Sequence, residues 1–195
     1  MPETLTFVTN NDHKLAEIRQ ILQPVFTIRG LTDLPFEGEI PETCPDIAGN
    51  ALQKAHFIHD RFGINCFADD TGLEVEALDG APGVYSARYA GEKATYSDNV
   101  NKLLAEMEGT KNRRARFITV IALILNGREH LFEGRVDGQI LAFARGERGF
   151  GYDPVFEPDG SNLSFAEMEA DMKNAISHRG EAVRKLAAFL QQLPK

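Results

Sequence analysis

Two adjacent carboxylates, Asp69 and Asp70, are the residues of this sequence best suited to chemistry. They follow a brief apolar stretch, residues 65–68, which reads as a strand. Because side chains alternate along an extended chain, the two carboxylates are expected to point to different sides, so that one serves a site while the other fixes the loop. A carboxylate at a strand end suits a Mg²⁺ ligand or a general base, since hard divalent cations take oxygen ligands. The alternative is an Asp-rich turn, which the spacing alone favours.

A polar loop lies between the first expected strand, residues 4–9, and the first expected helix, residues 14–22. Backbone N–H groups at a helix N-terminus, joined by a hydroxyl and a lysine, form a phosphate-binding arrangement. The members of this loop are Thr9, Asn10, Asn11, Asp12, His13 and Lys14. The Walker A pattern G-x-x-x-x-G-K-[ST] occurs nowhere in the chain. Simple capping of the helix by Asn or Asp is the alternative, and the loop taken in isolation favours it.

A glycine-flanked aromatic pair stands beside a third carboxylate, in the string Gly149-Phe150-Gly151-Tyr152-Asp153-Pro154. An aromatic ring can stack on a nucleobase, which contributes roughly 1–3 kcal/mol in single-strand binders. The carboxylate of Asp153 could accept a hydrogen bond from the N1–H of a 6-oxopurine, whereas adenine has only an acceptor at N1. The alternative is a tight turn with packed aromatic residues, and the string by itself does not decide between them.

Three potential cations, Lys173, His178 and Arg179, lie just before the last expected helix. The lysine could pair with a phosphate or with Asp153, and the guanidinium of Arg179 could donate to a purine O6 in a fixed geometry. The alternative is a solvated basic segment, which is the usual role of such clusters.

The elements expected to position these groups indicate an α/β fold. Helical periodicity and caps predict helices over residues 14–22, 47–62, 97–107 and 181–193, with a helical turn at 164–168. Asn126-Gly127 predicts a hairpin between residues 116–125 and 130–136, and further strands are expected at residues 26–28, 65–68, 73–77 and 139–144. Residues 34–45 read as a loop exposed enough to carry function. Since helices alternate with both hairpins and separated strands, a mixed sheet is expected rather than a purely parallel one.

Composition narrows the classes of function. A chain of 195 residues fits one domain, residues 1–195, that could have two lobes. The net charge of −8 argues against a nucleic-acid binder, which needs a broad cationic face, but it leaves room for a small polyanion. We expect no signal peptide and no membrane span, because the longest apolar run is residues 120–125. The two cysteines have no disulfide or metal-ligand pattern, so a cytoplasmic protein with reduced thiols is expected.

The order of the motifs is more specific than any one of them. The strings are Thr9-Asn10-Asn11 to Lys14, then Asn50-Ala51 with Lys54-Ala55, then Ala68-Asp69-Asp70-Thr71-Gly72-Leu73, then Gly80-Ala81-Pro82-Gly83-Val84-Tyr85-Ser86-Ala87-Arg88-Tyr89-Ala90-Gly91, then Gly149 to Pro154 and Lys173 to Gly180. In this order they closely resemble the inosine triphosphate pyrophosphatase family, also called the Ham1 family, of non-standard purine nucleoside triphosphate pyrophosphatases. The resemblance runs essentially from end to end.

The resemblance implies an α/β fold with a long mixed central sheet, flanking helices and two lobes around a central substrate cleft, usually as a homodimer. It also implies Mg²⁺, attack of water at the α-phosphorus and release of pyrophosphate from ITP, dITP or XTP. By motif position, Asp70 looks like the catalytic base and a metal ligand, with Glu42 as the second ligand. Substrate contacts are implied for Thr9 to Lys14, Lys54 and Thr71, and base recognition for Phe150, Gly151, Tyr152, Asp153, Lys173, His178 and Arg179. Gly49 stands where the family often has Glu.

Two other functions compete with this interpretation. A related pyrophosphatase could act on modified pyrimidine or methylated guanine nucleotides, although Asp153 and Arg179 suit a 6-oxopurine better. A nucleotide sensor would bind the triphosphate without cleaving it, although the intact carboxylates and Lys14 argue for cleavage. Guanine shares the N1–H and O6 groups of a 6-oxopurine, so these two residues alone do not reject it.

Overall fold

The computed structural model describes residues 4–22 and 26–193, and within these ranges seven strands form one mixed sheet. The strands are β1 (Thr4–Val8), β2 (Thr27–Arg29), β3 (Cys66–Val75), β4 (Pro82–Gly83), β5 (Arg114–Leu125), β6 (Arg128–Ile140) and β7 (Phe156–Pro158). Their order is β2-β1-β3-β5-β6-β7, with β4 paired to β3. β1 runs parallel to both β2 and β3, whereas β4 and β7 are antiparallel to their neighbours. The α/β fold with a mixed sheet that the sequence predicted is therefore confirmed.

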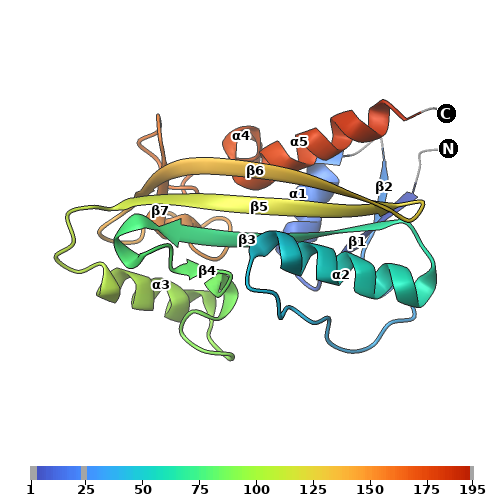
Figure 1. Cartoon of the computed structure of the whole chain (residues 1–195). Helices are drawn as coiled ribbons and strands as arrows, with labels where there is room; N and C mark the ends of the chain where they lie inside the picture. The colour runs from blue at the N-terminus through green and yellow to red at the C-terminus, as the bar shows by residue number, and fades with distance from the viewer. Residues whose placement is uncertain (1–3, 23–25, 194–195) are drawn as a thin grey trace. The chain divides into compact units, whose positions relative to one another are not determined.

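The helices are α1 (Asp12–Leu22), α2 (Ile47–Phe62), α3 (Tyr96–Glu106), α4 (Ala170–Ile176) and α5 (His178–Gln191), as labelled in Figure 1. The described residues divide into two compact units. The first unit comprises residues up to 70, residues 119–134 and residues from 179 onward; the second comprises residues 71–118 and 135–178. No helix in the described ranges is long and apolar enough to cross a membrane.

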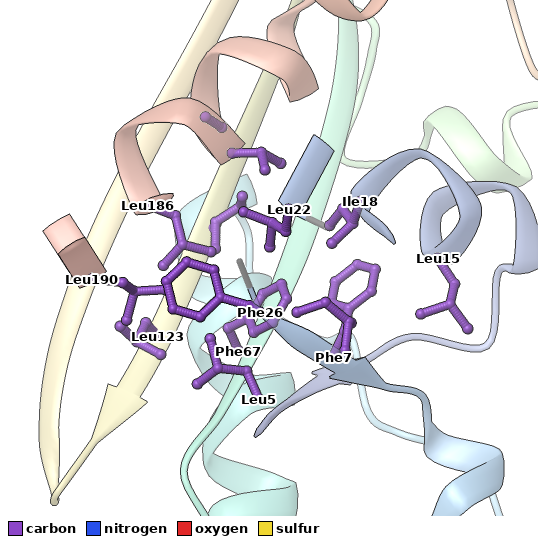
Figure 2. Packing of buried hydrophobic residues seen from close by; sticks show 14 of the residues in the cluster. Leu5, Phe7, Leu15, Ile18, Leu22, Phe26, Phe67, Leu123, Leu186 and Leu190 are labelled. Atoms are coloured by element: carbon purple, nitrogen blue, oxygen red, sulfur yellow. The ribbon is translucent and has the colours of Figure 1, made fainter. Parts of the chain in front are cut away.

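In the first unit, α1 and α5 share one hydrophobic core with the central strands (Figure 2). Helix α1 buries Leu15, Ile18 and Leu22, which recur at helical spacing along one face. Below them, the rings of Phe7 in β1 and Phe67 in β3 stack with centroids 4.8 Å apart. Because Phe67 packs in this core, its side chain lies on the α1/α5 face of β3.

Helix α2 covers the opposite face of the first unit, across the strands from α5 in Figure 1. It begins after Asp46, whose carboxylate accepts a hydrogen bond from Gly49 N (2.7 Å), and it ends at Gly63 in the left-handed region (φ 64°). Its buried residues include Ala55, whose carbonyl accepts from the Cys66 thiol of β3 at 3.3 Å. Side chains on β3 therefore alternate between the α1/α5 core and α2.

The second unit has its own core, formed by apolar residues of β3, α3, β5, β6, β7 and the 150–168 segment. Helix α3 begins with a capping box between Thr95 and Asp98, as its sequence favours. The loop after β4 is held by Ser86, whose hydroxyl donates to Gly83 O (2.6 Å) and accepts from Leu73 N (2.9 Å). Ser86 thus has a structural role in the described fold.

Two expectations about elements need correction, a third agrees with the structure, and one helix was not expected. β3 is one strand that continues through Asp69 and Asp70 to Val75, because its pairing with neighbouring strands, β1 up to Ala68, then β4 at Leu73 and Glu74, and β5 in the sheet order, outweighs the low strand propensity of Asp. Residues 139–144 are not a separate strand, since β6 ends at Ile140 and the next strand is β7. The helical turn expected at residues 164–168 is present as a turn, in which Glu167 N donates to Ser164 O (3.1 Å) and Met168 N to Phe165 O (3.3 Å). Helix α4 was not expected, because it has only seven residues and buries Lys173 and Asn174 instead of an apolar face.

The hairpin around Asn126-Gly127 is confirmed, with β5 and β6 flanking the two residues. Both residues have positive φ (51° and 75°), as a two-residue turn of the mirror-image type requires. The helix expected over residues 47–62 matches α2 residue for residue.

Candidate active site

On the α2 side of β3, Asp70 lies in a buried group of charged and polar side chains. Lys54 Nζ hydrogen-bonds to Glu42 and lies 3.6 Å from Asp70 Oδ1, while Asn50 Nδ2 donates to Asp70 Oδ2 at 3.3 Å. Burial raises the pKa of Asp70, and the charges of Lys54 and Lys14, which act to lower that pKa, are opposed by those of Glu42 and Asp69. Burial acts to lower the pKa of Lys54, but the charges of Asp70 and Glu42 outweigh it and raise that pKa.

On the α1/α5 side, Asp69 lies between two cations. Its Oδ1 accepts from Lys14 Nζ at 2.9 Å and its Oδ2 from Arg179 Nε at 3.2 Å; Arg179 Nη1 also donates to Glu17 at 2.5 Å. Burial acts to raise the pKa of Asp69, but Lys14 and Arg179 hold it well below its usual range. For Lys14, burial is the larger effect and lowers the pKa.

The two faces of β3 therefore differ in charge balance. The prediction that Asp69 and Asp70 point to different sides is confirmed, because their partners come from α1 and α5 in one case and from α2 and its preceding loop in the other. Among the described residues, the ion pairs on the Asp69 side join two cations, Lys14 and Arg179, to two carboxylates, Asp69 and Glu17, and these charges balance. The ion pairs on the Asp70 side join one lysine, Lys54, to two carboxylates, Glu42 and Asp70, which leaves one excess negative charge.

That excess charge suits a divalent cation. In the described ranges, no group of three or more His, Cys, Asp or Glu side chains forms a metal cage. Mg²⁺ usually binds one or two carboxylates together with substrate phosphates, keeping several waters. Glu42 and Asp70, which both contact Lys54, offer such a pair of hard oxygen donors.

The loop between β1 and α1 is folded as a capped helix start. Asn11 Oδ1 accepts from the N–H groups of His13 (3.0 Å) and Lys14 (3.2 Å), and Thr9 Oγ1 accepts from Asn11 N (3.1 Å). The capping alternative is thus realised, and it places Lys14 in the first turn of α1 with its ammonium on Asp69. Phosphate binding by Thr9, Asn10, Asn11, Asp12, His13 and Lys14 stays a prediction.

In the second unit, Asp153 accepts hydrogen bonds from two groups of the expected base-recognition set. Its Oδ2 lies 2.7 Å from Lys173 Nζ and 2.8 Å from Phe150 N, and both charged side chains are buried. A Cβ on Gly149, which has φ 72°, would lie 2.1 Å from that oxygen, so this position requires glycine. The Asp153–Lys173 contact expected from the sequence is therefore present.

The aromatic residues of this set differ in what they can contact. Tyr152 is buried and its hydroxyl donates to Ser86 O at 2.9 Å, so the structure gives it a role in packing. Phe150 is half-buried, with Lys173 Nζ 5.0 Å from its ring centroid, and offers the more accessible ring for stacking. His178 is buried and stacks on Phe117 with centroids 4.6 Å apart. Base contacts by these residues and by Gly151 remain predictions, as does the substrate contact of Thr71.

Arg179 is the residue whose contacts differ most from the sequence interpretation. Its side chain donates to Asp69 and Glu17, which belong to the first unit as Arg179 does, whereas Asp153 and Lys173 belong to the second. Its contact with a purine O6 stays a prediction. Glu17 was not singled out from the sequence, and Asn50 entered only as part of the Asn50-Ala51 motif string, without a role. Each lies at helical spacing from a residue that was singled out: Glu17 follows Lys14 by three positions, and Asn50 precedes Lys54 by four.

Replacing Asp69 by Asn is expected to destabilise the fold. The change leaves the buried Arg179 and the half-buried Lys14 without their shared carboxylate, and breaking a buried ion pair such as Arg179–Asp69 costs about 3–5 kcal/mol. Since the folded-state pKa of Asp69 is depressed, its stabilisation is present above the unfolded pKa of about 3.9 and is lost as pH falls below it. Urea unfolding should show a constant difference between wild type and variant at pH 5–8 that shrinks below about pH 4. Asp60→Asn, at an exposed position of α2, is the control, and an equal loss in both variants would contradict the ion-pair role.

These features define an α/β protein with a two-sided ionic site on its central strand. The chain belongs to the Ham1 family, whose model matches residues 5–189. It is 56% identical over 189 residues to a dITP/XTP pyrophosphatase of Porphyromonas gingivalis, covering 96% of this chain and 97% of that one. It is 49% identical to a dITP/XTP pyrophosphatase of Flavobacterium johnsoniae, covering 95% and 97%. The Ham1 protein of Staphylococcus aureus superposes with a TM-score of 0.88 at 36% identity (97% and 98% covered), and that of Coxiella burnetii with 0.90 at 35% (98% and 100%).

Proposed function

We propose that this protein is a nucleoside triphosphate pyrophosphatase that converts the non-standard purine nucleotides ITP, dITP and XTP to the monophosphate and pyrophosphate, and so cleanses the nucleotide pool. Membership of the Ham1 family and the dITP/XTP pyrophosphatases among its relatives support this substrate class. The observation that supports this chemistry is the excess negative charge around Asp70. The neighbouring carboxylate on the same strand, Asp69, is by contrast ion-paired.

In the proposed reaction, Asp70 accepts the proton of a water molecule that attacks the α-phosphorus. The new bond joins the water oxygen to that phosphorus, the bond to the α,β-bridging oxygen breaks, and pyrophosphate leaves with the bond's electron pair. Lys14 and Lys54 offset the negative charge of the phosphates. Mg²⁺, when held by Glu42 and Asp70, supplies further charge neutralisation.

Discrimination of the base is assigned to the second unit. The carboxylate of Asp153, held by Lys173 and by Phe150 N, would accept from N1–H of hypoxanthine or xanthine and repel the bare N1 of adenine. A site built for such a hydrogen bond rejects an analogue lacking the donor by a factor on the order of 10⁴.

A pyrophosphate-release panel tests this function. With Mg²⁺ present, ITP, dITP and XTP should be cleaved with kcat/KM on the order of 10⁴ times that of ATP. GTP is the informative competitor, since it has the same N1–H and O6 groups. Comparable kcat/KM for GTP and ITP would overturn the specificity. Binding of ITP without pyrophosphate release would indicate a sensor instead, and preference for modified pyrimidine or methylated guanine nucleotides would indicate a related pyrophosphatase.

We also propose that the protein works as a cytoplasmic homodimer, as the family resemblance implies. Light scattering coupled to size exclusion tests the assembly, and a single-chain mass across micromolar concentrations would contradict it.

A further inference from the structure

The loop that carries Glu42 is fastened to the first turns of α2. Thr43 N donates to Gln53 Oε1, and Gln53 Nε2 donates back to Thr43 Oγ1, both at 2.9 Å. Cys44 N donates to Asn50 Oδ1 at 2.9 Å. Close packing accompanies these bonds, because a Cβ on Gly49 would lie 2.8 Å from the Cβ of Cys44. The position of Glu42 therefore depends on how this loop is held against the helix.

Among the α2 residues that hold the loop by its backbone, Asn50 is the one that also contacts Asp70. Its side chain is 1% exposed, accepts from Cys44 N through Oδ1 and donates to Asp70 Oδ2 through Nδ2 at 3.3 Å. One planar amide thus bridges the loop of Glu42 and the carboxylate of Asp70. An aspartate could keep the first bond but has no proton to donate in the second when ionised.

We propose that Asn50 is a positioning residue that aligns the carboxylate of Asp70 with the loop bearing Glu42. The expected effect on turnover rests on the proposed function. The link between Asp70 and the loop bearing Glu42 rests only on the two hydrogen bonds of Asn50. Residues that orient the direct ligands of a metal or the reacting groups commonly account for about 10–100-fold in activity or metal affinity.

Cys44 supplies a probe of the loop that is independent of catalysis. It is partly exposed, whereas Cys66, the other cysteine, is buried and its pKa is raised to about 12, mainly by burial. A thiol reagent such as Ellman's reagent should therefore label Cys44 in the folded protein and leave Cys66 unmodified. The Cys44→Ser variant should lose this labelling, which identifies Cys44 as the labelled thiol.

Two substitutions separate the two bonds of Asn50. In Asn50→Ala both bonds are lost, so labelling of Cys44 should be about fivefold faster, and kcat for ITP should fall about 10–100-fold with a smaller change in KM. In Asn50→Asp the acceptor for Cys44 N is kept, so labelling should stay within about twofold of wild type, while kcat falls as in the alanine variant. Melting temperatures identify any variant that fails to fold. If Asn50→Ala fails to fold, the near-isosteric Asn50→Asp still tests the proposal.

Asn101→Ala and Asn101→Asp, at an exposed position of α3, are the matched controls and should change neither readout. Unchanged labelling in Asn50→Ala, or wild-type kcat in Asn50→Asp, would overturn the assignment. A wild-type protein that releases no pyrophosphate from ITP would contradict the proposed function instead, and the labelling rates would still test the link between Asn50 and the loop.

Discussion

Asp70→Asn is expected to fold normally and to lose most of its turnover of ITP. The amide keeps the size of the side chain and can still contact Asn50 and Lys54, but it accepts no proton from water and is a poor metal ligand. Loss of a general base lowers the rate by about 10²–10⁴-fold, and loss of a metal ligand adds to this. Pyrophosphate release under saturating ITP measures the effect, with the melting temperature as the check on folding.

Asp79→Asn is the matched control for this substitution. Asp79 is exposed and has φ 51°, a conformation that Asn accepts readily, so its activity should equal that of wild type. Wild-type kcat in Asp70→Asn would refute the role of Asp70 as the base. Loss of the native fold in Asp70→Asn is not expected, because removing its charge relieves the repulsion between Asp70, Glu42 and Asp69.

Removing divalent metal should abolish hydrolysis. A triphosphate carries about four negative charges, and among the described residues Asp70 and Glu42 share one ion-pair partner, Lys54, so the bare site repels its substrate. In excess EDTA we expect the rate to fall by a factor on the order of 10³ or more, since metal ions supply several kcal/mol of charge stabilisation in such reactions. Addition of Mg²⁺ beyond the chelator should restore the rate.

The same experiment has an internal check on the fold. The Asp69 side of β3 is balanced by Lys14 and Arg179 without any metal, so the melting temperature should change little in EDTA. Hydrolysis that persists in excess EDTA would contradict the metal requirement, and collapse of the fold in EDTA would show that the metal has a structural role.

Local signals predicted the parts of this fold that depend on neighbours in sequence. Alternation along an extended chain was enough to place Asp69 and Asp70 on opposite faces, and Asn126-Gly127 was enough to locate the hairpin. Helix α2 was predicted to the residue because its apolar face is regular and Gly63 ends it in the left-handed region.

Features that depend on distant partners were not predictable from one sequence. β3 looked finished at Asp69 because Asp is a poor strand former, yet pairing with β5, and with β4 at Leu73 and Glu74, carries it on to Val75. Arg179 was grouped with Lys173 by sequence proximity, whereas its observed partners, Asp69 and Glu17, lie far away along the chain. The role of Asn50 was not predictable from its neighbours in sequence, because it consists in bridging two separate segments of the chain.

The first unit is built from segments that lie far apart in the sequence, and this affects folding during synthesis. The core around Phe7 and Phe67 also requires Leu186 and Leu190 of α5, which belong to the last helix described (Figure 2). A ribosome-bound chain therefore exposes the apolar faces of β1 and α1 until that helix has emerged, and long-range closure of this kind slows folding and favours aggregation. Nascent chains stopped before α5 should accordingly be poor folding units, and chaperone capture during synthesis would be most useful in that interval.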